Sequence, residues 1–132
     1  MADKAARQPY GQNIKGSYRT EGAALTRGYA VEAGTAEDQV KAASGTGVSC
    51  IGLVDESTLA VGDIAGVVEF GLAIGIAGGA LGTLNTPVKA ASGGKLVAAN
   101  ATDNHTIGYT RSIADGDGDE VLVFVVPNHK RS

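Results

Sequence analysis

The chain contains the same hexapeptide twice, and this internal repetition limits its possible folds more than any other feature. Positions 40–45 read Val-Lys-Ala-Ala-Ser-Gly, and positions 88–93 repeat them without change. Two dipeptides also recur: Ile51-Gly52 at Ile107-Gly108, and Gly62-Asp63 at Gly118-Asp119. The two dipeptides have the same separation along the sequence, and it is larger than the separation of the two hexapeptides. We therefore expect a scaffold built by duplication of a strand–turn–strand unit, with a short insertion in the second copy.

The composition favours one domain with many turns and a thin aliphatic core. The 132 residues include 20 glycines but only two phenylalanines, four tyrosines and no tryptophan. A chain of this length buries roughly two-thirds of the surface that it exposes when unfolded. With 19% charged residues and a net charge of −3, it has neither the basic excess of a nucleic-acid-binding protein nor the charge of an acidic disordered tail. We expect no nucleic-acid partner.

The sequence predicts no disulfide and no membrane segment. The single cysteine, Cys50, lies in the apolar run Val-Ser-Cys-Ile, where we expect a buried, unreactive thiol. The first residues are polar and lack the apolar centre of a signal peptide. Residues 70–88 carry no charge, but their five glycines and one proline disfavour a membrane-spanning helix.

Apolar alternation separated by turn residues predicts an all-β domain, either a small β-barrel or β-tulip-like domain or a compact sandwich. Ser92-Gly93-Gly94 separates two short apolar runs and predicts a tight hairpin turn with positive φ angles. The expected strands cover residues 25–31, 39–43, 48–54, 65–76, 87–91, 95–99, 106–113 and 120–126.

The predicted organisation is an extended N-terminal arm over residues 1–20, a β domain over 21–128 with related units at about 25–71 and 72–127, and a tail over 129–132. Four cations against one acid make the arm basic. Apolar residues at four-residue spacing among these cations suit a segment that orders on an acidic partner, although an idle terminal tail is the alternative. The candidate contact residues are Arg7, Tyr10, Ile14, Lys15, Tyr18 and Arg19.

One predicted strand has a bulky face and a bare face. Large apolar residues occupy positions 70, 72, 74 and 76, and the alternate positions hold Gly71, Ala73 and Gly75. Since alternate side chains of a strand point to opposite faces, the bare face allows another backbone to approach closely. That backbone belongs either to the same domain or to a neighbouring subunit, or the strand is simply weakly packed. Gly71, Ala73 and Gly75 are therefore candidate subunit-contact residues.

The sequence offers no convergent set of reactive groups, so we expect no enzyme, no cofactor and no metal site. His105 follows Asp103 by two residues, which is a weak metal signal, and His129 lies near the end. Asp115, Asp117 and Asp119 alternate like the start of a calcium loop. Such a loop needs glycine at its sixth position and glutamate at its twelfth, where this chain has Glu120 and Val126. A solvated hairpin turn explains them better.

Residues 82–99 read Gly-Thr-Leu-Asn-Thr-Pro-Val-Lys-Ala-Ala-Ser-Gly-Gly-Lys-Leu-Val-Ala-Ala, and Ile-Gly-Tyr at 107–109 and Gly-Asp-Glu-Val-Leu-Val at 118–123 follow them. Residues 27–70 contain the related succession Ala-Val-Glu-Ala-Gly, Val-Lys-Ala-Ala-Ser-Gly, Ile-Gly-Leu-Val and Gly-Asp-Ile-Ala. Over residues 20–127 this pattern resembles the capsid cement, or head decoration, proteins of tailed bacteriophages.

The resemblance implies a non-enzymatic virion protein, made in the host cytoplasm, that binds the exterior of the assembled capsid. Its expected partners are the major capsid protein and further copies of itself, in a homotrimer on a local threefold axis. In that setting the arm residues become candidate capsid contacts. Two other readings stay open: another structural virion component, such as a tail or fibre protein, and a ligand-binding β-module.

Overall fold

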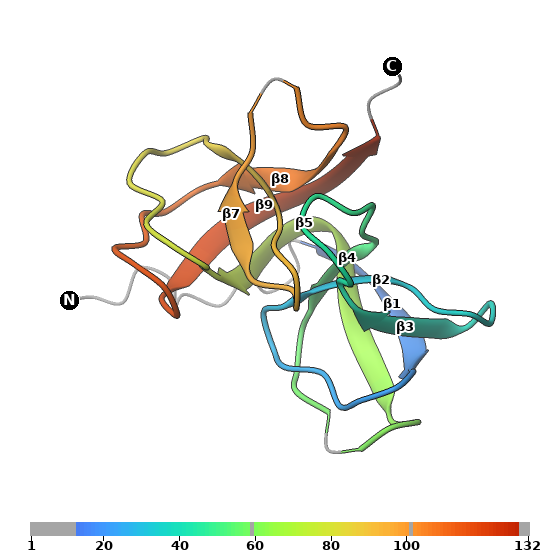
Figure 1. Cartoon of the computed structure of the whole chain (residues 1–132). Helices are drawn as coiled ribbons and strands as arrows, with labels where there is room; N and C mark the ends of the chain where they lie inside the picture. The colour runs from blue at the N-terminus through green and yellow to red at the C-terminus, as the bar shows by residue number, and fades with distance from the viewer. Residues whose placement is uncertain (1–12, 59, 101, 130–132) are drawn as a thin grey trace.

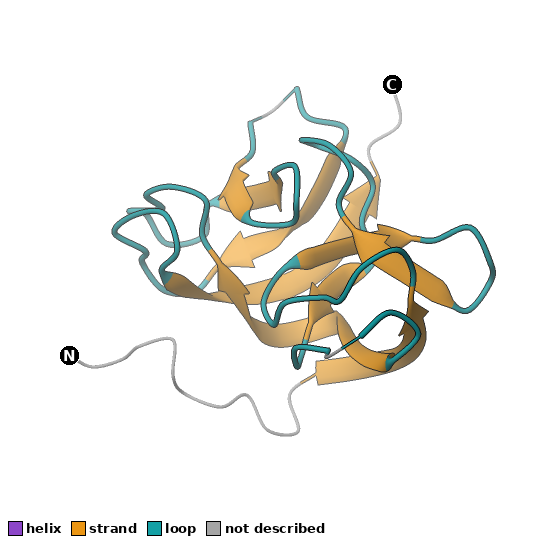
Figure 2. Ribbon diagram, turned by 60° about the horizontal axis from the view of Figure 1, so that its bottom comes forward, coloured by secondary structure: helices purple, strands orange, loops and turns teal. Residues whose placement is uncertain are grey.

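The computed structural model describes residues 13–58, 60–100 and 102–129. All regular secondary structure in these residues is β, which confirms the predicted fold class of a small barrel-like all-β domain (Figure 2). The described strands are β1 (Asn13–Thr20), β2 (Ala30–Ala33), β3 (Gln39–Ala42), β4 (Gly52–Val54), β5 (Ile64–Ile76), β6 (Pro87–Ala90), β7 (Leu96–Ala98), β8 (His105–Thr110) and β9 (Glu120–His129).

The strands form two small barrels that share β5. The sheet order is β1-β3-β2-β4-β5-β9-β8-β6-β7, and β1 also pairs with β5, which closes a ring of five strands. On the other side, β7 returns to the end of β5 through a parallel bridge between Ala77 and Leu96. The first barrel lies at the lower right of Figure 1 and the second at the upper left, with β5 between them.

The pairing registers show that the two barrels are structural repeats. Ala33 pairs with Val40 between β2 and β3, and Ala90 pairs with Leu96 between β6 and β7. The sequence separation between these two pairs is nearly that of the repeated dipeptides. The β4–β5 pair Leu53 and Val68 and the β8–β9 pair Tyr109 and Phe124 have that same separation without any difference. The strands of the two barrels therefore correspond in order: β1 to the second part of β5, β2 to β6, β3 to β7, β4 to β8, and the first part of β5 to β9.

This correspondence corrects the interpretation of the repeated hexapeptide. Val40 lies on β3, whereas Val88 lies on β6, the counterpart of β2. By register, the counterpart of Val88 is Val31, which pairs with Ala42 as Val88 pairs with Ala98. The two identical hexapeptides thus occupy different positions in their barrels, and their shorter separation does not indicate an insertion.

The two repeated dipeptides, in contrast, do mark equivalent positions. A Cβ at Gly52 would collide with the carbonyl oxygen of Val68, and a Cβ at Gly108 would collide with that of Phe124. Gly62 and Gly118 both precede an aspartate and have φ angles of 91° and 90°. The carboxylates of those aspartates accept backbone hydrogen bonds within their turns, from Ala60 in the first barrel and from Asp115 and Gly116 in the second. The physical requirements of each dipeptide are therefore the same in both repeats.

A common core joins the barrels. One hydrophobic cluster lies within the first barrel, and the larger one includes residues of both barrels, such as Leu53, Leu96 and Val121. The predicted hairpin turn at 92–94 has positive φ angles at Gly93 and Gly94, which confirms the turn prediction. Gly94 lies against β2: its carbonyl accepts a hydrogen bond from the Ala30 N–H at 2.7 Å, and a Cβ there would lie 2.8 Å from the Ala30 oxygen.

The predicted arm is in part a strand of the domain. Its residues 13–20 form β1, which pairs with β5 in antiparallel and with β3 in parallel orientation. The described domain therefore begins at Asn13 and not at residue 21. Arg7 and Tyr10 lie outside the described residues. In the part of the chain that the structure describes, no helix has the length and apolar character needed to cross a membrane.

Candidate interaction surface

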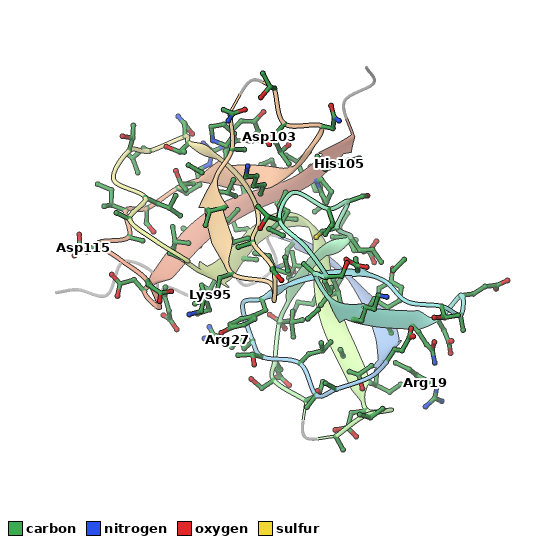
Figure 3. All side chains as sticks on the ribbon, viewed as in Figure 1. Arg19, Arg27, Lys95, Asp103, His105 and Asp115 are labelled. Atoms are coloured by element: carbon green, nitrogen blue, oxygen red, sulfur yellow. The ribbon has the colours of Figure 1, made fainter. Side chains whose placement is uncertain are left out.

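The charged side chains of the described residues are spread over both barrels. Asp103 and His105 lie at one end of the second barrel, Asp115 projects from another of its loops, and Arg19 lies on the far side of the first barrel (Figure 3). Among the described residues no group of three or more His, Cys, Asp or Glu side chains could hold a metal ion. The described residues therefore bring no metal-binding cluster together.

The acidic residues singled out in the sequence have local structural roles. The Asp119 carboxylate accepts hydrogen bonds from the backbone of Asp115 and Gly116 at 3.0 Å and so holds its own turn. Asp117 forms an ion pair with Lys95 at 2.9 Å. Asp103 pairs with Lys89 at 3.1 Å. These acidic side chains therefore stabilise a turn and form ion pairs with lysines of the same chain.

Cys50 is buried, as the sequence predicts. Its side chain is 6% exposed and lies in the larger core cluster. Burial, with a smaller contribution from the negative charge of Glu32, raises the pKa of the Cys50 thiol from 9.0 to about 12. At neutral pH the thiol stays protonated, and the thiolate is the nucleophilic form of cysteine. Cys50 is a core residue.

The polar candidates of the arm are already engaged within the first barrel. Lys15 forms an ion pair with Asp55 at 2.8 Å, and Arg19 lies 3.6 Å from Asp38. The Tyr18 hydroxyl donates to a Glu69 carboxylate oxygen at 2.7 Å. This hydrogen bond, followed by burial and the charge of Glu69, raises the pKa of Tyr18. The three side chains tie β1 to its neighbours.

The bare face of β5 faces the interior. Ala73 is only 4% exposed, and a Cβ at Gly75 would lie 2.6 Å from Leu96 Cδ1 and 3.4 Å from Leu53 Cδ1. The bare face is therefore approached by residues of the same domain and not by a neighbouring subunit. Gly71, with φ of 105°, pairs with both Asn13 and Val125 where β5 changes partner from β1 to β9. A subunit contact through Gly71, Ala73 and Gly75 is thus replaced by packing within the chain.

An exposed apolar surface lies on the opposite side of these strands. Ile14 and Phe70 are paired between β1 and β5, and Phe124 is paired with Leu72 on β5 and with Tyr109 on β8. Residues directly opposite in antiparallel strands project to the same face. The rings of Phe70 and Phe124 pack edge to face with centroids 5.3 Å apart, which joins the two pairs. We call the set Ile14, Phe70, Leu72, Tyr109 and Phe124 the β1–β8 apolar surface.

A guanidinium borders this surface. The Arg111 Cζ atom lies 5.4 Å from the centroid of the Phe124 ring, a cation–π geometry, and Arg111 also donates to Asn85 Oδ1. Ile14 is 64%, Phe70 46% and Tyr109 41% exposed. Neighbouring exposed apolar side chains of this kind mark interaction surfaces, whereas scattered ones do not.

The sequence indicated Ile14 as a candidate capsid contact of the arm, but it did not indicate Tyr109, Arg111 or Phe124. A signal for Phe124 was present: Val121, Val123 and Val125 alternate with it, and all three are fully buried. A strand that buries these three valines must place Phe124 on its other face. The pairing of Phe124 with Tyr109 depends on register, which periodicity alone does not give.

Comparison with known proteins gives a fold match but no sequence match. No protein-family model and no curated protein matches the sequence. The chain is similar to the crystal structure of the N base of the head fiber gp8.5 in bacteriophage phi29, with a TM-score of 0.66 and 11% sequence identity. The alignment covers 90% of this chain and 98% of that chain, so the two share a fold over nearly their whole length.

Proposed function

We propose that this chain is a structural protein of a bacteriophage virion that binds the exterior of the assembled head and reinforces contacts between major capsid protein subunits. The observation that carries the proposal is the likeness to the N base of the phi29 head fiber, which extends over 98% of that chain. The repeated motifs that resemble head decoration proteins support the same assignment independently, because they are a property of the sequence alone.

The organisation of the described residues fits a rigid binding module that performs no reaction. The carboxylates and glycines that the sequence repeats serve turns and close strand contacts in both barrels. Every buried side-chain nitrogen and oxygen atom of the described residues has a hydrogen-bond partner. Catalytic sites instead gather polar groups whose hydrogen-bonding capacity is directed at a substrate.

Physical linkage explains how such a module would stabilise a head. A protein that binds only the assembled lattice shifts the assembly equilibrium by mass action. The same contact is repeated many times on one particle, so individually weak contacts give a large total effect through multivalency. A homo-oligomer, with a trimer as the expected form, would add further simultaneous contacts per binding event.

The test uses purified full-length protein and expanded heads of the encoding phage that lack it. We expect the protein to sediment with the heads and to raise their melting temperature, while unexpanded precursor heads serve as the comparison. A truncation that removes residues 1–12 is the right test of the arm, because a longer deletion would remove β1. Full-length protein that neither sediments with heads nor changes their melting temperature would contradict the proposal.

A fibre base is the second candidate, and the fold match itself favours it, since the matched structure is the base of a head fiber. In that case the domain would attach a projecting fibre to the head. Electron microscopy of decorated heads separates the two: a cement protein gives compact surface density, whereas a fibre base gives a projection that extends from each site.

A further inference from the structure

We propose that the β1–β8 apolar surface is the interface between copies of this chain. The inference rests on the proposed function and deepens its oligomeric part by naming the face through which the copies associate. Its test needs no heads, so its failure is distinguishable from a failure of the capsid-binding proposal.

The residue types on this surface are those that dominate protein–protein interfaces. The chain has two phenylalanines, Phe70 and Phe124, and both lie on this surface. Tyr109 also belongs to it, and Arg111 lies beside it. Aromatic residues and arginine are enriched at interface cores and among the side chains that contribute most to affinity. A thin-cored chain that places both phenylalanines on one outer face leaves that face with apolar area that a partner can bury.

The surface extends over four strands. It crosses β1, β5, β9 and β8, which pair with one another in that succession. Neighbouring strands lie about 4.8 Å apart, and two sheets that pack face to face lie about 10 Å apart. The surface is the outer face of paired strands, so association here would use side chains and leave the backbone ladder intact.

Charge complementarity favours a second copy as the occupant. Residues 13–129 contain seven lysines and arginines against thirteen aspartates and glutamates, whereas the remaining residues contain four cations and one acid. The body thus carries a net charge of −6 and the terminal segments +3. Six of the seven body cations are already paired with carboxylates of the same body, and the seventh is Arg111. The surplus acidic groups therefore match the surplus cations of the terminal segments.

The position of Asn13 connects this charge argument to the apolar surface. Asn13 pairs with Gly71, directly after the pair formed by Ile14 and Phe70, and its side chain donates to the Leu72 carbonyl at 2.8 Å. The N-terminal segment therefore joins the body at the rim of the apolar surface. Twelve residues reach at most about 40 Å, so this segment is long enough to contact a neighbouring copy that meets this face.

The test compares variants of the full chain by sedimentation velocity across a concentration series. The variant Ile14→Ser/Phe70→Ser removes two exposed side chains from the surface, and Val61→Ser removes a similarly exposed one, at 58% exposure, near the opposite end of the β1–β5 pair. We expect the wild-type chain to form a closed oligomer. The surface variant should raise its dissociation constant about 100-fold or more, and the control variant should leave it unchanged.

A second measurement avoids the risk that serine substitutions impair folding. Ile14→Cys adds one surface thiol to a chain whose own cysteine is buried. We expect its rate of maleimide labelling to fall as protein concentration rises, while Val61→Cys labels at a constant rate. A wild-type chain that stays monomeric at the highest concentration of the series would overturn the inference, as would concentration-independent labelling at position 14. Loss of head binding by the surface variant in a monomeric protein would assign the surface to the capsid instead.

Discussion

Replacing Gly108 with alanine places a methyl group where the fold has no room for it. A Cβ at this position would collide with the carbonyl oxygen of Phe124 and would lie 2.9 Å from its carbonyl carbon and 3.1 Å from Val125 Cα. All three atoms belong to the backbone of β9, so no side-chain rotation relieves the contact. The strand itself must move away from β8.

The cost follows from that movement. Inserting a group into a packed site costs about 1–3 kcal/mol, and a displaced strand weakens adjacent ladder hydrogen bonds worth about 1 kcal/mol each. We expect Gly108→Ala to lower the free energy of unfolding by about 2–4 kcal/mol, or the melting temperature by roughly 8–16 °C. Because Gly52 meets the Val68 carbonyl in the same way, Gly52→Ala should cost a similar amount.

Urea denaturation followed by circular dichroism measures both variants. Gly116→Ala is the matched control, since no heavy atom lies within 4 Å of a Cβ built there, and it should change stability by less than about 0.5 kcal/mol. A Gly108→Ala protein as stable as the wild type would refute the close strand contact. Unequal costs at Gly52 and Gly108, beyond about 1.5 kcal/mol, would contradict their equivalence in the two repeats.

Three further predictions concern local contacts. Asp63→Ala and Asp119→Ala each remove a carboxylate that holds a turn, so each should cost about 1 kcal/mol in urea denaturation, and Asp115→Ala should cost less. Cys50 has a pKa of about 12 in the folded state against 9.0 ordinarily, so below pH 9 both states keep the proton. Between pH 9 and 12 the unfolded chain loses it first, and wild-type stability should fall relative to Cys50→Ala by about 1.4 kcal/mol per pH unit; parallel pH profiles would contradict this. Glu69→Gln removes the carboxylate that accepts the Tyr18 hydrogen bond, so ultraviolet titration should show a lower Tyr18 pKa, and an unchanged titration curve would argue against that contact.

Strands bounded by clear turn residues were predictable from the sequence. The prediction of strands over 65–76 and 87–91 closely matches β5 (Ile64–Ile76) and β6 (Pro87–Ala90), because glycine and proline punctuate the apolar runs there. The prediction over 25–31 lies too early, since Gly28 adopts a φ of 86° and regular pairing in β2 begins only at Ala30.

β1 was missed for a reason that the structure makes clear. Its sequence contains Gly16 and alternates without a strong apolar period, which is typical of a tail. A Cβ at Gly16 would meet the Glu69 carboxylate, which passes over this position to reach the Tyr18 hydroxyl. Such a contact joins residues that are far apart in the sequence, so local sequence patterns carry no trace of it.

The candidate interaction surface was only partly predictable for a similar reason. Alternation fixes which residues of a strand share a face, but it does not by itself show which face is the outer one. The contact between Phe70 and Phe124 depends on Gly71, where β5 exchanges β1 for β9 as its partner. The same exchange turns the predicted bare face inward against Leu53 and Leu96. Closure of two barrels around one strand is a tertiary property.

The proposed function assigns this chain to the outside of a phage head, and electron cryomicroscopy of mature particles tests that claim most directly. We predict two-barrel density on the outside of the head shell at positions that bridge neighbouring capsid subunits, with copies meeting through the β1–β8 apolar surface. Density for the chain in the tail, inside the shell, or nowhere on the particle would contradict it.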